Sequence, residues 1–282
     1  MSIIVSGATG LLGSVLCEHL KERGLEVIRL ARSLKTDASS ISCDLVTEQP
    51  TVKHPEMMEK VDTVVHLAAI AHPGVGGYAK ECRLNNVLML KNMLHCMEDA
   101  HWIYASSVRV YDKYHKDDPI SVDSRIGALD EYAESKIECE KLLLSKVKSV
   151  EIMRLAPVFN ENNLGDFKKR IFLPGGVLKA SVTPCPRHSF CHTKTFSKYV
   201  AETIRSGCSG QWIQHCVDGH VYSQDEMLDG FPGLQVNINR YHVERILKVV
   251  SLIWSGSELK IRNKFDRFFV NNVYTKGRVR VG

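Results

Sequence analysis

Three glycines near the N-terminus constrain the fold more than any other feature of the sequence. Gly7, Gly10 and Gly13 stand between an apolar run at residues 2–6 and a stretch at 11–23 whose apolar residues recur with helical spacing. Glycine is needed where backbone turns tightly or approaches another group without room for a Cβ atom. A strand, a glycine turn and a helix in this order predict a pyrophosphate site at the helix N-terminus. The alternative is a glycine-rich turn that binds no ligand.

Strand-like and helix-like stretches alternate over the first 156 residues. Further strands are predicted at residues 26–30, 41–45, 63–67, 102–106 and 151–155. Helices are predicted at residues 83–97 and 128–146. This alternation predicts the α/β class, with a Rossmann-type doubly wound parallel sheet and helices on both of its faces.

Prolines and glycine pairs break up the pattern beyond residue 156. A helix is predicted at residues 195–206, a strand at 212–217, and an apolar helix at 243–254 that serves as core or as a subunit contact. We therefore predict two domains. Residues 1–156 form a dinucleotide-binding Rossmann domain, and residues 157–282 form a smaller C-terminal α/β substrate lobe.

Composition excludes several classes of protein. The 282 residues carry 37 basic and 32 acidic side chains, and a net charge of +5 is too small to predict binding to nucleic acid. The nine cysteines include no CxxC pair and the twelve histidines no HExxH motif, so we expect reduced thiols and no metal site. Without a long apolar run or a signal-like N-terminus, we expect a cytoplasmic protein with no stable membrane insertion.

The end of the second predicted strand indicates which cofactor the glycine turn binds. An acidic residue there would bind the ribose 2′-hydroxyl of NAD, whereas an arginine suits the 2′-phosphate of NADP. The sequence has Ala31 followed by Arg32, which favours NADP over NAD unless Arg32 is only a solvated loop residue. Asp44 lies at the end of the short strand predicted at 41–45. It either accepts a hydrogen bond from the adenine amino group or caps its own turn.

A tyrosine and a lysine stand four residues apart in the predicted helix at 128–146. This spacing places Tyr132 and Lys136 on one face, where an ammonium group lowers the pKa of a phenol and suits it to acid–base catalysis. Ala105, Ser106 and Ser107 close a strand upstream of this helix. Since ligands bind at the carboxyl ends of strands in open α/β sheets, a serine there is predicted to hold a substrate oxygen beside the tyrosine.

The sequence resembles the extended short-chain dehydrogenase/reductases, in the branch of sugar-nucleotide epimerases, dehydratases and reductases. The matching segments are residues 7–13, 44–45, 66–69 (HLAA), 86–87, 105–111 (ASSVRVY), 132–136 (YAESK) and 154–159, in the family's order and spacing. The resemblance implies hydride transfer at a sugar carbon, usually C4, of a nucleoside-diphosphate sugar, and leaves a homodimer open.

The resemblance also assigns the site residues. The implied catalytic set is Ser107, Tyr132 and Lys136, with Asn86 supporting the site. Together with the analysis of the strand ends, the predicted cofactor contacts are Gly7, Gly10, Leu11, Leu12, Gly13, Arg32, Asp44, Leu45, Leu67, Ala68, Ala69, Tyr132 and Lys136.

Several departures from the family leave the substrate open. Pro157 stands where 4-epimerases use asparagine toward the substrate, and Lys194 and Thr195 replace two aspartates. Six basic residues lie between positions 166 and 194: Lys168, Lys169, Arg170, Lys179, Arg187 and Lys194. They either meet a diphosphate, with Arg187 as the chosen contact, or form a solvated loop. A 4-epimerase and a 4-keto-reductase are both compatible with the sequence. The alternatives are an NADP-dependent reductase of a non-sugar carbonyl and an inactive NAD(P)-binding scaffold.

Overall fold

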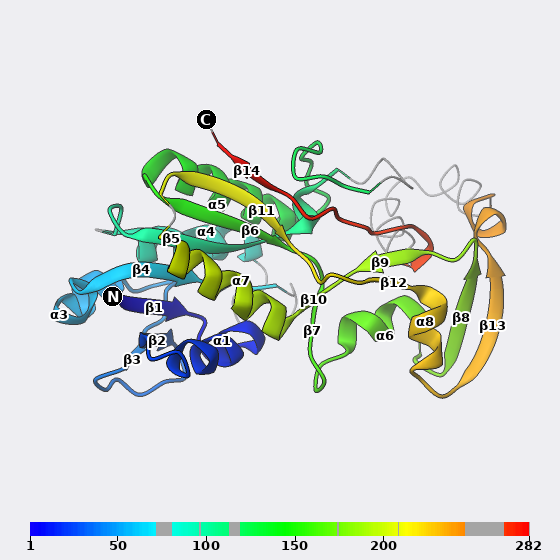
Figure 1. Ribbon diagram of the computed structural model, residues 1–282, viewed down its shortest axis with the longest axis horizontal. Coiled ribbons are helices and arrows are strands. Elements are labelled where there is room, and N and C mark those ends of the chain that lie inside the picture. Colours follow the sequence, from blue (N-terminus) through cyan, green and yellow to red (C-terminus); the bar gives the residue numbers. More distant parts are fainter. Residues whose placement is uncertain are drawn as a thin grey trace.

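An eight-stranded sheet forms the centre of the molecule (Figure 1). The computed structural model describes residues 1–71, 81–95, 97–112, 119–173, 175–207, 209–245 and 268–281. The strand order is β14-β11-β6-β5-β4-β1-β2-β3, and every neighbouring pair is parallel except β11 with β14. The strands are β1 (Ser2–Ser6), β2 (Glu26–Ala31), β3 (Ser40–Ser42), β4 (Val61–His66), β5 (His101–Ser107), β6 (Val150–Leu155), β11 (Gln211–Cys216) and β14 (Arg278–Arg280).

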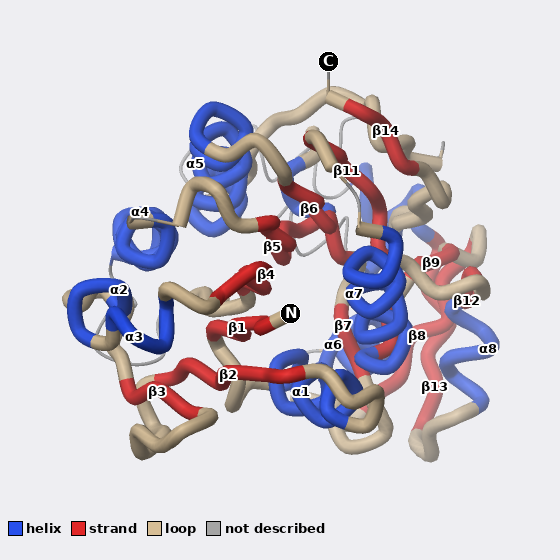
Figure 2. Tube along the Cα trace, turned by 60° about the vertical axis from the view of Figure 1, so that its left-hand side comes forward, coloured by secondary structure: helices blue, strands red, loops and turns tan. Residues whose placement is uncertain are grey.

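Helices cover both faces of this sheet (Figure 2). On one face α1 (Leu11–Lys21) packs beside α7 (Thr193–Ser206), and on the other α4 (Cys82–Leu94) packs beside α5 (Glu131–Lys146). The short helices α2 (Pro50–Lys53) and α3 (Pro55–Met58) lie between β3 and β4 in the chain. Two helix layers on a parallel sheet confirm the predicted fold class.

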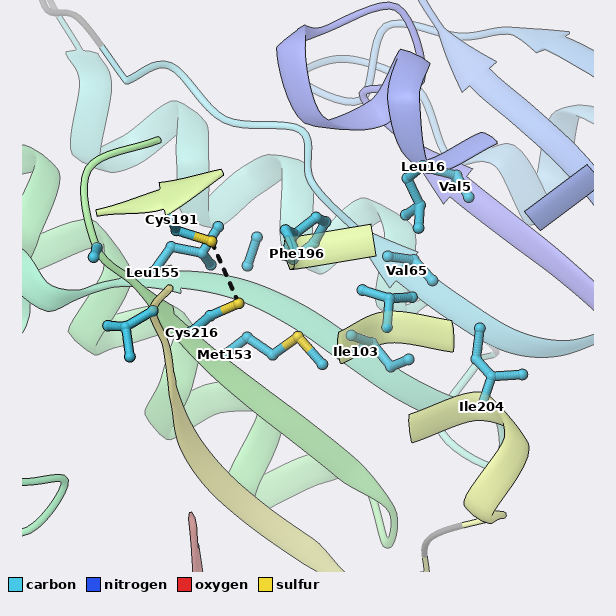
Figure 3. Close-up of a cluster of buried hydrophobic side chains, with 14 of the residues drawn as sticks. Val5, Leu16, Val65, Ile103, Met153, Leu155, Cys191, Phe196, Ile204 and Cys216 are labelled. Atoms are coloured by element: carbon cyan, nitrogen blue, oxygen red, sulfur yellow. Dashed lines mark hydrogen bonds between the residues drawn. The ribbon is translucent and has the colours of Figure 1, made fainter. Parts of the chain in front are cut away.

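Alternation along the strands builds two separate cores. Ile3 and Val5 of β1 pack toward α1 and α7, while Ile4 between them packs toward α4 and α5. This is the period-two pattern of a strand buried on both faces. Figure 3 shows the first core, where Leu16 and Phe196 of the two helices meet the sheet.

A smaller lobe lies beyond the carboxyl end of the sheet (Figure 1). Its elements are β7 (Val158–Phe159), α6 (Gly165–Ile171), β8 (Leu178–Thr183), β9 (Arg187–Ser189), β10 (Cys191–His192), β12 (Val221–Ser223), α8 (Gln224–Asp229) and β13 (Leu234–Asn239). The strands pair as β7 with β10, β9 with β12, and β8 with β13. Its core is aromatic, with the rings of Phe167 and Phe190 stacked at 3.9 Å between centroids.

The sheet does not stop at residue 156. Helix α7 and strands β11 and β14 come from the later part of the chain, and β11 pairs with β6 from Gln211 opposite Val150 to Cys216 opposite Leu155. The two predicted domains therefore stay a prediction, because the sheet takes residues from both.

Several predicted elements have other bounds in the structure, among them the helix predicted at 83–97, which ends at Leu94, and one element cannot be compared. The strand predicted at 41–45 ends at Ser42, because Asp44 begins a turn. The helix predicted at 128–146 begins at Glu131, because the Asp130 side chain caps it by accepting from the N–H of Ala133 at 2.9 Å. Most of the helix predicted at 243–254 lies outside the described residues. In the described ranges, no helix is long and apolar enough to cross a bilayer.

Candidate active site

The glycine turn lies where the strand order reverses, between β2 on one side of β1 and β4 on the other. Such a switch point is the usual place of a ligand in an open α/β sheet. Gly7 has a φ of +69°, and a Cβ there would lie 2.9 Å from the Ala68 nitrogen. A Cβ on Gly13 would lie only 2.2 Å from the Gly7 carbonyl oxygen. Both glycines are therefore required for the close packing of the turn against the segment after β4 and of α1 against the turn.

Ser6 ties the segment after β4 to this turn. Its hydroxyl oxygen accepts from the backbone N–H groups of Leu67 at 3.1 Å and Ala68 at 3.3 Å, and lies 3.0 Å from Nδ1 of His66. Burial, followed by the charge of Lys136, lowers the pKa of His66 to about 3, so its imidazole is neutral. Since the serine oxygen accepts twice, its proton is directed to the imidazole. Leu67 and Ala68 are thus fixed beside the glycine turn, where the cofactor was predicted.

Asn86 joins the same segment to helix α5. Its Oδ1 accepts from the N–H of Ile70 at 2.7 Å, and its Nδ2 donates to the Ser135 hydroxyl at 2.9 Å. That hydroxyl in turn donates to the carbonyl of Tyr132 at 2.7 Å. The supporting role predicted for Asn86 has a geometric basis, since this chain of bonds ends on the residue that carries the predicted acid–base group.

The three predicted catalytic residues come together at the carboxyl end of β5. Lys136 donates from Nζ to the carbonyl of Ala105 at 2.7 Å and lies 5.6 Å from the centre of the Tyr132 ring. The side chain of Ser107 faces the Tyr132 phenol and favours its ionised form. A phenol, a serine hydroxyl and an ammonium group therefore converge on one place, which is the arrangement that proton transfer to a substrate oxygen needs.

The charge state of this trio departs from the prediction. Burial raises the pKa of Tyr132 to about 12, against the opposing effects of the Arg109 guanidinium and the hydrogen bond with Ser107. Burial also lowers the pKa of Lys136 to about 8. The prediction that the pKa of Tyr132 is lowered is wrong here, because desolvation dominates and the Lys136 ammonium group faces the Ala105 carbonyl.

The structure gives the surroundings of the other predicted cofactor residues, beginning with those that follow β2 and β3. Arg32 is exposed after β2, and the next residue, Ser33, donates to the Thr9 hydroxyl of the glycine turn at 3.4 Å. Asp44 caps its own turn by accepting from the N–H of Val46 at 3.1 Å. Its adenine contact stays a prediction, as does that of buried Leu45. The remaining predicted contacts, Gly10, Leu11, Leu12 and Ala69, lie in the glycine turn, at the start of α1 or in the segment after β4.

The predicted basic surface of six residues is only partly present. Arg170 is buried against the Phe190 ring and donates to the carbonyl of Asp166 at 2.7 Å. Lys179 is buried too and donates to the carbonyls of Leu228 and Phe231. These two cations hold backbone carbonyls of the lobe and are not available to a diphosphate.

The other basic residues lie nearer to solvent. Lys169 pairs with Asp166 and Lys194 with Glu161, both at 3.4 Å. Arg187 is exposed on β9, so its contact with a diphosphate stays a prediction.

A buried polar network that the sequence did not predict lies beneath the site. Ser106 donates to Glu140 at 2.5 Å, and Glu140 forms an ion pair with Arg154 at 2.7 Å in which both side chains are almost fully buried. Arg154 donates to the hydroxyl of Tyr111 at 2.9 Å, which lies 2.7 Å from Nε2 of His215. Strand alternation is the signal that separates the roles of the two serines: Ser106 faces this network, and Ser107 faces the site. Among the described residues, no group of three or more His, Cys, Asp or Glu side chains is arranged to hold a metal ion.

The chain is similar to several known proteins. Over 163 residues the chain is 29% identical to an uncharacterised UDP-glucose epimerase, YtcB, of Bacillus subtilis (strain 168), covering 50% of each. Over 181 residues it is 25% identical to the dTDP-4-dehydrorhamnose reductase of Mycolicibacterium smegmatis (strain ATCC 700084 / mc(2)155), covering 58% of this chain and 48% of that protein. The chain thus spans about half the length of the curated relatives it matches.

A solved structure and a family model extend the comparison. The fold is similar to that of MoeE5 in complex with UDP-glucose and NAD, with a TM-score of 0.64, 19% identity and 85% of each chain covered. Residues 3–185 match the model of the NAD-dependent epimerase/dehydratase family, and this match includes the glycine turn, Ser107, Tyr132 and Lys136. The chain belongs to the NAD-dependent epimerase/dehydratase family.

Proposed function

We propose that this protein is an NAD(P)-dependent oxidoreductase or epimerase that acts on a nucleoside-diphosphate sugar by hydride transfer at a sugar carbon, C4 being the expected position. The observation that carries the proposal is the convergence of Ser107, Tyr132 and Lys136 beside a glycine turn at the switch point of the sheet. The family match and the names of the two curated relatives support the substrate class.

The residues present fit a dinucleotide. Glycines at 7 and 13 bring backbone close together at the N-terminus of α1, where free N–H groups and the helix dipole favour a pyrophosphate. Gly10, Leu11 and Leu12 would present backbone to it, and Lys136 would hold the ribose. When bound, the nicotinamide supplies the hydride chemistry.

The chain's own residues handle the proton. Tyr132 gives a proton to the reacting sugar oxygen or removes one from it, because its phenol lies beside Ser107 and Lys136 at the carboxyl end of β5. Ser107 orients that oxygen and stabilises charge that develops on it. Arg187 is proposed as a contact to the diphosphate. A homodimer and a cytoplasmic location stay predictions.

The seven cysteines in the described ranges form no disulfide with one another.

Epimerase and reductase activity remain two versions of one proposal, because the two curated relatives carry one name of each kind. A non-sugar carbonyl is a weaker candidate, since both of those names specify a nucleotide sugar. An inactive scaffold is disfavoured because all three predicted catalytic side chains are present and lie close together.

A paired assay tests the proposal. We expect the purified protein either to interconvert UDP-glucose and its C4 epimer with catalytic oxidised cofactor, or to oxidise a reduced cofactor with dTDP-4-dehydrorhamnose. Tyr132→Phe is the matched inactive variant. Mass spectrometry of nucleotides released from the freshly purified protein identifies a co-purified substrate independently. If neither reaction proceeds and the protein binds neither of the two nucleotide sugars, the proposed substrate class is wrong.

Arg32 is expected to make the protein prefer NADP(H) over NAD(H). A charge-assisted contact with the 2′-phosphate is worth about 1.5–3 kcal/mol, or roughly tenfold and more in affinity. Titration of both cofactors should show this gap in the parent and its loss in Arg32→Ala. Arg23→Ala is the control, since Arg23 is exposed at the opposite end of α1 from the glycine turn. Tighter binding of NAD(H) by the parent would contradict the prediction.

A further inference from the structure

Arg109 lies in a short turn that is anchored at both ends. The turn η2 (Val108–Val110) follows β5, and the hydroxyl oxygen of Ser107 accepts from the N–H of Arg109 at 3.2 Å. On the far side, the Tyr111 hydroxyl belongs to the buried network with Arg154 and His215. The backbone of Arg109 is therefore held relative to both the site and the core.

The side chain of Arg109 is fixed as well. Its guanidinium carbon lies 5.1 Å from the centre of the Tyr132 ring, and its Nη2 forms an ion pair with Oδ2 of Asp130. The other oxygen of Asp130 caps α5, the helix that carries Tyr132. One residue thus contacts two of the three predicted catalytic groups, Ser107 through its backbone and Tyr132 through its guanidinium.

Charged and titratable groups approach Tyr132 from several elements. They are Arg109 of η2, Asp130 at the start of α5, Lys136 of α5, Cys82 of α4, and Tyr104 and Ser107 of β5. Burial raises the pKa of the phenol, and Arg109 provides the largest opposing effect, while Cys82 and Asp130 act in the same direction as burial. Lys136 is engaged with the Ala105 carbonyl. Arg109 is therefore the cation that most favours the ionised tyrosine.

We propose that Arg109 is a positioning residue of this site: its backbone N–H orients Ser107, and its guanidinium stabilises the negative charge left on Tyr132 after that residue has given up its proton. The O–H bond of the tyrosine breaks, the proton moves to the sugar oxygen, and the electron pair stays on the phenolate. Because Ser107 accepts from Arg109, its own proton is directed into the site. The catalytic role of Arg109 rests on the proposed function. The electrostatic effect of its guanidinium on the Tyr132 phenol does not depend on that function.

A titration without substrate tests the coupling. Replacement of all nine tyrosines by 3,5-difluorotyrosine lowers the pKa of every phenol, and fluorine NMR follows each ring. The resonance that is missing in Tyr132→Phe identifies Tyr132. We expect Arg109→Gln to raise the titration midpoint of that resonance by roughly one pH unit, since a cation within about 6 Å has been removed. Arg109→Lys, which keeps the charge, should remain close to the parent.

Two further variants make the result decisive. Arg83→Gln removes another arginine that pairs with acids of α5, Glu134 and Glu138, and should leave the midpoint unchanged. Asp130→Asn keeps a cap but removes a negative charge, and should lower the midpoint, which tests the coupling even if Arg109→Gln fails to fold. An unchanged midpoint in a folded Arg109→Gln, or in Asp130→Asn, would overturn the inference.

Kinetics separate this inference from the proposed function. With UDP-glucose and oxidised cofactor, Arg109→Gln should lower kcat near neutral pH and move the rising limb of its pH profile upward, with little change in KM. A change in KM alone would assign Arg109 to binding and overturn the positioning role. If the parent turns over no nucleotide sugar, the proposed function fails, while the fluorine titration still decides the coupling.

Discussion

Tyr132→Phe is expected to lower the rate of hydride transfer by about 10²–10⁴-fold, the usual worth of a positioned acid–base group. Binding should survive, because only one hydroxyl is removed and the ring stays close to both Arg109 and Lys136. Stopped-flow absorbance of the reduced nicotinamide measures the rate, and titration of cofactor and UDP-sugar measures affinity.

Two comparisons complete that experiment. Tyr199→Phe removes a hydroxyl from helix α7 and should leave turnover unchanged. Lys136→Met should affect both rate and cofactor affinity, since its ammonium group is expected to hold the ribose as well. Turnover near the parental value in Tyr132→Phe would show that Tyr132 is not the acid–base group and that the active site is wrongly assigned.

Arg154→Met is expected to have the largest effect on stability. It leaves the buried carboxylate of Glu140 without its cation, and breaking a buried pair in this way costs about 3–5 kcal/mol. For a chain of this size the melting temperature should fall on the order of 10 °C. Thermal unfolding followed by circular dichroism measures the loss.

The buried position is what makes this pair sensitive. Lys148→Met breaks an ion pair with Asp99 in which both side chains are about nine-tenths exposed, and should leave the melting temperature unchanged. The double variant Glu140→Leu/Arg154→Met should cost less than Arg154→Met alone, because no charge is then left buried. A double variant as unstable as the sum of its parts would show that the two groups act independently.

Local signals explain what the sequence was able to predict. The glycine turn and the paired Tyr132 and Lys136 depend on spacings within one turn or helix, and the structure places them as expected. The strands of the first half are recognisable because each is apolar and bounded by a turn or a helix cap. Both the doubly wound sheet and the family followed from these features.

Features that depend on distant contacts were missed. The return of β11 and β14 to the sheet is set by pairing with β6, which no local pattern announces. The six basic residues looked alike in the sequence, yet Arg170 and Lys179 point into the lobe and donate to backbone carbonyls. The pKa of Tyr132 depends on how deeply the folded chain buries it, which spacing does not report.

The path of the chain between sheet and lobe has a practical consequence for engineering. The polypeptide leaves the sheet after β6, comes back at α7, leaves again after β11 and comes back at β14 (Figure 1). A lobe attached by four crossings resists swinging about a single hinge, and one proteolytic cut does not release it. Transplanting the lobe from a relative to change substrate choice therefore requires two simultaneous grafts. A polypeptide truncated after β6 would expose that strand's edge and the face of α1 that α7 covers.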